Sequence, residues 1–521
     1  MGRGLRAGPT VTLAPSQRDR EQVVAALRQL LETSSTKRQV VQKSLLAIAR
    51  ARDGSDVLPL LQKFLRSGDV KRAEYATLAL GITGLDAAVP SLIHLARCDD
   101  EGHRMVKRAH VPYRVKSFAC YALGRIAHRT KNAQVRKDIY AVLELIAKAP
   151  KPYRRDLKVA ALQAMRTLRA DGDLSARALD FLHGYYRNKS EPAQIRAHAL
   201  TAIADLAGSA EAGAEAMRMN EILADRRQSA WMHQSATLAL GRLAVGTDAD
   251  SALRGYLSSG KDLQARFFAA ISLGRIGGPK NRAALLTKMI SRRTPRLLKP
   301  WLALGLAIAD ANARDKDPSH DVDQTAADAI HAEFKRTRNG IYAAGLGIAL
   351  GIMRYTDAGD DILDRMDQIK SQEAAAGYLA VALGLMGYSE ARETLHTIME
   401  HQTRKPRLVS QTAIALALLD DKEVSTHVLR SIASSESSTV LRSLSRTLGL
   451  VGDRRSLSQL LELLADKKLG AAQRALVAES LGLVADIDPL PWNTVFSVGT
   501  NYQAKVATLT HAAGGGVLDI Q

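Results

Sequence analysis

The chain has 521 residues, a formal net charge of +20, 46% hydrophobic residues and only 4% aromatic residues. Two cysteines in a chain of this length exclude a disulfide-stabilised scaffold, and no run reaches the roughly 18 apolar residues that a membrane-spanning helix needs. No secretory signal opens the sequence as given, so we expect a soluble protein, cytoplasmic by default. Ala, Leu and Gly supply most of the apolar residues, which favours closely packed helices.

Residues 1–17 are basic and rich in small residues, and we predict a disordered N-terminal arm there. The first helices are expected at 21–32 and 37–51. After them one pattern recurs, an Ala-rich helix with a small residue between aliphatic residues in its last turn. A glycine inside a helix costs about 1 kcal/mol relative to alanine, so its recurrence predicts a close approach by a neighbouring backbone. The glycines of this pattern are Gly81, Gly124, Gly241, Gly274, Gly305, Gly351, Gly384, Gly449 and Gly482.

The spacing of this pattern indicates a repeat protein. The small positions at 351, 384, 417, 449 and 482 follow one another at 32 or 33 residues. Two helices per unit with a period in the thirties to forties are typical of an α-solenoid. The unit at 438–468 shows the pattern best, with a helix expected at 440–451, a Gly-Asp turn and a second helix at 455–465. Each helix has one apolar stripe, so neither buries it without neighbours.

The recurring helix, the Gly/Asp turn and the leucine-rich second helix resemble HEAT repeats. About 12 or 13 such units fit between residues 20 and 486, and armadillo repeats fit less well because 32 residues leave little room for a third helix. The resemblance implies an all-α, right-handed α-solenoid over residues 18–487. It also implies a scaffold that holds other macromolecules.

The last segment, residues 488–521, departs from the repeat because it contains prolines, aromatic residues and many β-branched residues. It resembles the ending of certain large bacterial HEAT-repeat proteins in two places, Pro491-Trp492-Asn493 and residues 516–520. We expect a short, non-helical, aromatic tail that caps the last repeat and covers its apolar face. Docking of a partner on this tail and disorder of the tail are the alternatives.

Two segments carry the positive charge. Residues 97–169 contain 18 Lys and Arg against 6 Asp and Glu, and residues 261–300 contain 10 against 1. Clustered cations bind nucleic acid through its phosphates in a salt-dependent way, and an acidic protein or an anionic membrane surface fits the same charge. The candidate residues for a polyanion or acidic partner are Arg104, Lys107, Arg108, Arg114, Lys116, Arg154, Arg155, Arg292 and Arg293.

No catalytic motif is found, and we expect no catalytic, cofactor-binding or metal-binding residue. The acidic segment 315–323 departs from a calcium loop, since His320 and Ala326 stand where such a loop requires Gly and Glu. We predict an edge loop there, with a weak cation site as the alternative. Cys98 and Cys120 are expected to be packing thiols.

The sequence therefore favours a non-catalytic scaffold that binds protein partners through its concave face and edge loops. The alternative is polyanion or nucleic-acid binding through residues 97–169 and 261–300. A third hypothesis is an enzyme of HEAT architecture, such as a DNA glycosylase or a cofactor lyase. The identity of any partner and the oligomeric state stay open.

Overall fold

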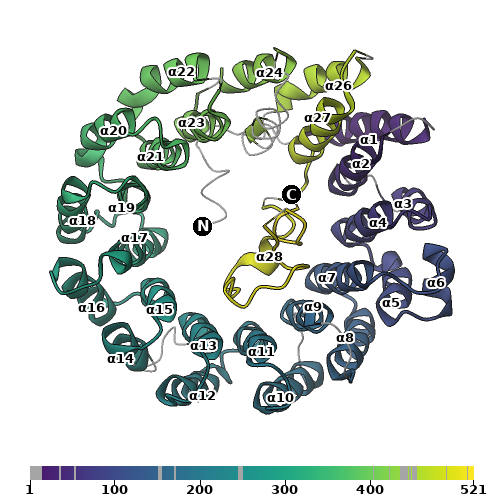
Figure 1. The fold of residues 1–521 in the computed structure, drawn as a ribbon, viewed down its shortest axis with the longest axis horizontal. Coiled ribbons are helices and arrows are strands. Elements are labelled where there is room, and N and C mark those ends of the chain that lie inside the picture. The colour runs from purple at the N-terminus through teal and green to yellow at the C-terminus, as the bar shows by residue number, and fades with distance from the viewer. Residues whose placement is uncertain are drawn as a thin grey trace. The chain divides into compact units, whose positions relative to one another are not determined.

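The computed structural model describes residues 15–33, 37–51, 54, 56–150, 155–168, 172–243, 250–402, 404–421, 423–434, 444, 447–448, 454–466, 468–488, 490–512 and 514–520. These residues form helices and turns, and none of them lies in a β-strand, so the expected all-α solenoid is confirmed (Figure 1). None of the described helices is long and apolar enough to cross a membrane.

The chain divides into two compact units that do not follow the chain order. Unit 1 holds residues 240–465, and unit 2 joins residues 15–239 to residues 466–521. This division does not coincide with the boundaries expected at 17/18 and 487/488. The C-terminal segment therefore belongs to the same unit as the first half of the chain.

Each unit consists of two layers of helices, an inner row and an outer row (Figure 1). The inner row of unit 2 consists of α2 (Arg38–Ala51), α4 (Val70–Thr83), α7 (Tyr113–Arg129), α9 (Arg155–Met165), α11 (Ala193–Leu206), α13 (Ala230–Leu243, which crosses the boundary to unit 1) and α27 (Ala471–Val484). Its other helices are α1 (Gln17–Glu32), α3 (Val57–Leu65), α5 (Val89–Arg97), α6 (Asp100–Val106), α8 (Ala133–Lys148), α10 (Asp173–Arg187), α12 (Ala212–Ala224) and the short α28 (Thr494–Ser497).

In unit 1 the inner row consists of α15 (Leu263–Ile276), α17 (Lys299–Lys316), α19 (Gly340–Met353), α21 (Glu373–Met386) and α23 (Pro406–Leu418). The outer row consists of α14 (Ser251–Ser259), α16 (Pro279–Ile290), α18 (Gln324–Arg336), α20 (Gly359–Gln368), α22 (Arg392–His401), α24 (Val424–Ser434) and α26 (Leu457–Ala465). The helix expected at 440–451 lies outside the continuously described residues, and the one expected at 455–465 is α26.

The recurring glycine marks the contact between successive inner helices, as its pattern predicts. A Cβ on Gly351 of α19 would lie 2.5 Å from the carbonyl oxygen of Ala382 in α21, and one on Gly384 would lie 2.8 Å from the Cα of Ala415 in α23. Only a residue without a side chain allows this approach. Because the contact occurs at the corresponding position of each helix, successive inner helices of unit 1 run parallel.

The same contact joins the end of the repeat pattern to its beginning within unit 2. A Cβ on Gly482 of α27 would lie 2.4 Å from the Cα of Ala47 in α2. The charged pair of Asp486 with Arg50, 3.9 Å apart and buried, lies at the end of this packing. The face of α27 that a further repeat would cover is therefore packed against α2.

The local differences from the expected elements are small. The helix α1 begins at Gln17 with a Ser16 cap, and residues 1–14 of the expected arm lie outside the described residues. The short helix α6 lies between α5 and α7, and α17 extends to Lys316, into the edge loop predicted at 315–323.

Candidate functional site

The C-terminal tail, residues 488–520, lies along the inner row of unit 2, on α7, α9, α11 and α13 (Figure 1). The expected cap on the last repeat is not what these contacts show, because α2 already covers α27 and the tail packs on the first half of the chain. The tail packs there because inner helices of unit 2 carry polar side chains that bind it. Without the tail, this surface of the solenoid would face water.

The tail is anchored first by a buried carboxylate. Asp488 accepts hydrogen bonds from the guanidinium groups of Arg125 and Arg129 on α7. The side chains of Arg125 and Asp488 are 8% and 11% exposed, so the pair is largely removed from water. Breaking one partner of such a pair leaves the other charge without compensation.

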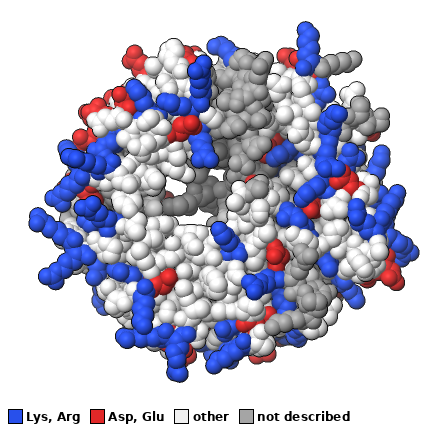
Figure 2. All heavy atoms as spheres, in the orientation of Figure 1, with Lys and Arg blue, Asp and Glu red and all other residues white. Residues whose placement is uncertain are grey.

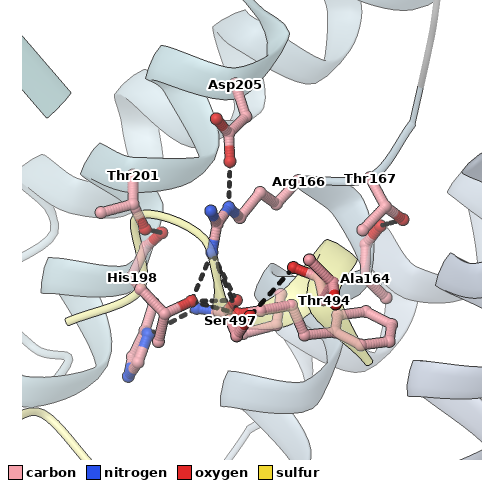
Figure 3. A network of polar contacts seen from close by, with 11 residues as sticks. Ala164, Arg166, Thr167, His198, Thr201, Asp205, Thr494 and Ser497 are labelled. Atoms are coloured by element: carbon pink, nitrogen blue, oxygen red, sulfur yellow. Dashed lines mark hydrogen bonds and ion pairs between the residues drawn. The ribbon is translucent and has the colours of Figure 1, made fainter. Parts of the chain in front are cut away.

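A second anchor is Arg166, which follows α9 and reaches between α11 and the tail (Figure 3). Its guanidinium donates to Asp205 of α11 and, on the tail side, to the hydroxyl of Thr500 and the carbonyl of Phe496. Gln163 accepts a further bond from Arg166 at 3.2 Å. The buried guanidinium thus has carbonyl, hydroxyl and carboxylate acceptors around it, as a buried charge requires.

His198 of α11 continues the network beside Arg166. Its Nδ1 lies 2.8 Å from the side-chain amide of Gln163, and its Nε2 lies 2.8 Å from the carbonyl oxygen of Ala504 in the tail. The neutral ring fits both contacts, with Nδ1 accepting and Nε2 donating. Complete burial lowers the pKa of His198 to about 4, and the nearby Arg166 charge acts in the same direction.

Side chains of the inner row also bind the tail backbone. Gln194 donates to the carbonyl of Lys505 at 2.7 Å, and the Trp231 ring nitrogen donates to the carbonyl of Gln503 at 3.3 Å. In the other direction, the Asn501 amide donates to the carbonyl of Trp231. Unit 2 therefore holds an irregular segment by its main chain, with side chains that come from successive inner helices.

The end of the tail is organised by its own polar residues. Asn493 donates to the carbonyls of Val517, Leu518 and Ile520 at 3.1–3.3 Å. These bonds connect the Pro491-Trp492-Asn493 motif to the motif at residues 516–520. Asp519 accepts from the main-chain amides of His511 and Gly516. Trp492 and Phe496 serve as packing, since Trp492 is 1% exposed and Phe496 is fully buried, whereas Tyr502 is 41% exposed.

The inner row of unit 1 differs in chemistry from that of unit 2. On α19 the residues that are not buried are Ile341, Tyr342, Gly345, Ile348 and Ile352, and all of these except Tyr342 follow one helical stripe. Several partly exposed positions on the neighbouring helices are also aliphatic, although α15 and α23 carry the polar residues Gln264, Arg275, Arg407 and Gln411 at exposed or partly exposed positions. The aliphatic residues, named here the apolar row, are Ile271, Leu304, Ile308, Ile341, Ile348, Ile352, Val381, Leu385, Ile414 and Leu418.

The basic segment at 97–169 lies in unit 2, where several of its cations form ion pairs. Arg114 pairs with Glu74 at 3.2 Å and donates to the carbonyl of Gly515, so it belongs to the tail contact. Further pairs join Lys158 to Glu191, Arg166 to Asp205, and Arg125 and Arg129 to Asp488. The carboxylates come from segments far along the sequence, which a local charge count does not include.

The remaining candidate cations differ in exposure. Arg104 pairs with Glu101 at 2.7 Å, Lys107 ends α6 in the left-handed region with φ 51°, and Arg108 donates to the carbonyl of Gly68. Lys116 is half-buried on α7 and Arg155 is exposed, and Arg154 lies outside the described residues. Arg292 and Arg293 are exposed in unit 1, in the turn before α17.

Two candidate chemical clusters have structural partners. Among residues 315–323, Asp323 caps α18 and pairs with Arg282, and Asp317 accepts from Ser319. Cys98 is half-buried with its Sγ 3.3 Å from His103, and Cys120 is fully buried. Within the part of the chain that the structure describes, no three His, Cys, Asp or Glu residues are grouped so as to hold a metal.

Comparison with known proteins adds little to this geometry. No protein-family model matches the chain, and no curated protein matches it. Among solved structures, human deoxyhypusine hydroxylase in complex with glycerol is 18% identical, with 56% of this chain and 97% of that chain covered and a TM-score of 0.23. An engineered protein is 15% identical, with 82% of this chain and 98% of that chain covered and a TM-score of 0.23.

A chain from a structure concerned with the interaction between cadherin and beta-catenin is 12% identical. The match covers 85% of this chain and 99% of that chain, at a TM-score of 0.26. At these TM-scores the similarities support no statement about the activity of this chain.

Proposed function

We propose that the chain is a non-catalytic α-solenoid scaffold of HEAT type, which binds a protein partner along the apolar row of unit 1. The observation that carries this proposal is the contrast between the two inner rows. Unit 2 has a polar inner row that holds the chain's own tail, whereas unit 1 presents aliphatic side chains that are partly exposed to water.

The composition of the apolar row favours a protein partner with aliphatic or aromatic side chains. Exposed apolar patches larger than a few hundred Å² are uncommon on monomeric proteins and mark interaction surfaces. Burial of such side chains in an interface stabilises a complex by about 25 cal/mol for each Å² removed from water, before the entropic cost of association. A row that spans five parallel helices suits an elongated segment of the partner.

The polar residues of unit 2 support the non-catalytic part of the proposal. Arg166, His198 and Asp205 form a largely buried group of titratable side chains on the inner row of unit 2, and all three have partners in the tail or in neighbouring helices. Their contacts position the tail, and this is a structural task.

The experiment that tests the proposal is a substitution in the apolar row with a matched control. Ile341 is 73% exposed on the inner row, and Ile290 is 64% exposed on α16 of the outer row. Because both are exposed, I341D and I290D should each change the free energy of unfolding by less than about 0.5 kcal/mol. Placing a charge in the interface should weaken partner binding by about tenfold or more for I341D only.

The measurement is quantitative affinity capture with the full-length protein after nuclease treatment, followed by mass spectrometry. We expect a set of proteins that wild type and I290D retain and I341D loses. Equal recovery by all three proteins, or recovery of no protein above background, would contradict the proposal.

A further inference from the structure

The two edges of unit 1 carry opposite charge. Because the inner helices run parallel, the loops that precede them lie on one edge, and the turns that follow them lie on the other. The preceding loops, at 260–262, 291–298, 337–339, 369–372 and 402–405, contain eight Lys and Arg and one Asp. We name this the basic edge; its cations are Lys261, Arg292, Arg293, Arg296, Arg338, Lys370, Arg404 and Lys405.

The opposite edge consists of the turns at 277–278, 317–323, 354–358, 387–391 and 419–423, and its sequence has eight Asp and Glu against two Lys and Arg. Several of its carboxylates are used inside the unit. Asp323 pairs with Arg282, and Asp421 lies 2.7 Å from His396. The sequence separates the two signs of charge, and the acidic side is partly neutralised by internal pairs.

The cations of the basic edge are mostly uncompensated. Lys370 pairs with Asp367 at 3.0 Å. The other seven make no ion pair within the described residues, and all of them except the half-buried Lys405 are exposed. Figure 2 draws one face of the molecule, on which exposed Lys and Arg side chains are more frequent than Asp and Glu side chains. Inner helices pack about 10 Å apart, so one cationic loop follows another at that interval.

Aromatic side chains lie beside these loops, in the first two turns of the inner helices. Tyr378 of α21 is 50% exposed, and Tyr342 of α19 is partly exposed. Phe267 of α15 and Trp301 of α17 are also partly exposed and stack on each other, with ring centroids 5.2 Å apart and planes 7° from parallel. Four consecutive inner helices thus each carry a partly exposed aromatic ring within two turns of the preceding cationic loop.

We propose that the basic edge of unit 1 binds single-stranded nucleic acid. The exposed cations contact successive phosphates, and the adjacent rings of Phe267, Trp301, Tyr342 and Tyr378 stack on bases. Single-strand binding surfaces combine these two elements, a cationic track and aromatic platforms. This inference is independent of the protein scaffold proposed above, because it uses the edge and its border rather than the aliphatic row.

The aromatic residues decide between nucleic acid and an acidic protein. An acidic segment of a protein would be bound by the cations alone, and the rings would contribute no charge-independent affinity. Bases stack on aromatic rings with about 1–3 kcal/mol each. Loss of one ring should therefore weaken nucleic-acid binding without changing its dependence on salt.

The experiment measures the fluorescence anisotropy of a labelled oligouridylate with the full-length protein at several salt concentrations. For single strands the slope of log affinity against log salt is about −0.7 for each phosphate contacted. The variant R292Q/R293Q should reduce the magnitude of this slope by about 1.4. Y378L keeps an apolar side chain and should weaken binding about tenfold at an unchanged slope.

The matched control is K280Q/K316Q, which removes the same charge from exposed positions in helical turns next to the opposite edge. It should leave both affinity and slope unchanged, and thermal unfolding verifies that all variants fold. The proposal is overturned if oligouridylate does not bind, if the control lowers the slope as much as R292Q/R293Q, or if polyglutamate competes as well as unlabelled oligouridylate.

Discussion

Replacing Arg166 with methionine should lower the free energy of unfolding by about 3–5 kcal/mol, the usual cost of removing one partner from a buried ion pair. The guanidinium is 3% exposed and Asp205 is 10% exposed, so R166M leaves a buried carboxylate without its cation. It also removes the donors to Thr500 and to the carbonyl of Phe496 in the tail. The loss should therefore appear in unit 2 and should loosen the tail.

Urea-induced unfolding measures this effect, with two variants as controls. R187M removes an exposed arginine at the end of α10 and should cost less than about 0.5 kcal/mol. R166M/D205N removes both charges and should recover part of the loss, because no uncompensated ion remains. A cost below about 1 kcal/mol for R166M would mean that the Arg166 contacts do not hold the tail.

Acidification from pH 7 to pH 4.5 should destabilise the protein by about 2–3 kcal/mol through His198 alone. Burial lowers the pKa of His198 in the folded protein to about 4, against 6.5 for an ordinary histidine. In this window the unfolded chain binds a proton that the folded chain excludes. The stability that depends on neutral His198 is therefore fully present above pH 6.5 and is lost as the pH falls toward 4. The loss amounts to about 1.36 kcal/mol for each unit by which the pKa is lowered.

The variant H198Q isolates this contribution, because glutamine has no titrating group in the window and can still donate to the carbonyl of Ala504. Wild type and H198Q are compared by the pH dependence of the unfolding midpoint between pH 7 and pH 4.5. We expect a clearly steeper decline for wild type. Parallel curves would indicate that His198 is protonated in the folded protein or that the tail does not bury it.

The repeat architecture was predictable because it depends on local patterns. Apolar stripes define each helix, and a small residue such as Gly351 or Gly384 defines the contact with the next inner helix. These signals lie within one repeat, so the sequence shows them directly. The chain order of the two units was not predictable, because the packing of α27 on α2 joins residues more than 400 positions apart.

The tail and the charges required information that a linear sequence does not hold. The polar stripe of α11, with Gln194, His198 and Asp205 at helical spacing, was a signal that an inner face of unit 2 has a polar partner. A charge count over residues 97–169 also leaves out Asp488 and Glu191, which lie outside the segment and pair with its cations.

Other residues of the basic edge are not evident from the linear sequence. Arg338 and Arg404 lie outside the basic segment at 261–300, yet the parallel stacking of inner helices brings their loops to the edge where Arg292 and Arg293 lie. A count of charge by loop type, rather than by continuous segment, would have found them. Tyr378 was not recognised because its exposure depends on the packing of the neighbouring helices.

The central claim is that the tail lies on the inner row of unit 2, and cross-linking tests it most directly. Gln194 contacts the carbonyl of Lys505 at 2.7 Å, so cysteines at these two positions are close together. The full-length Q194C/K505C protein, with Cys98 replaced by serine, is treated with a short bifunctional maleimide. The control is M217C/K505C, since Met217 is 62% exposed on α12 of the outer row.

Peptide mass spectrometry of the monomeric fraction then gives the yield of the intramolecular link. We expect a high yield for Q194C/K505C and little for M217C/K505C. No link between positions 194 and 505, or an equal yield for the two pairs, would contradict the docking of the tail on α11.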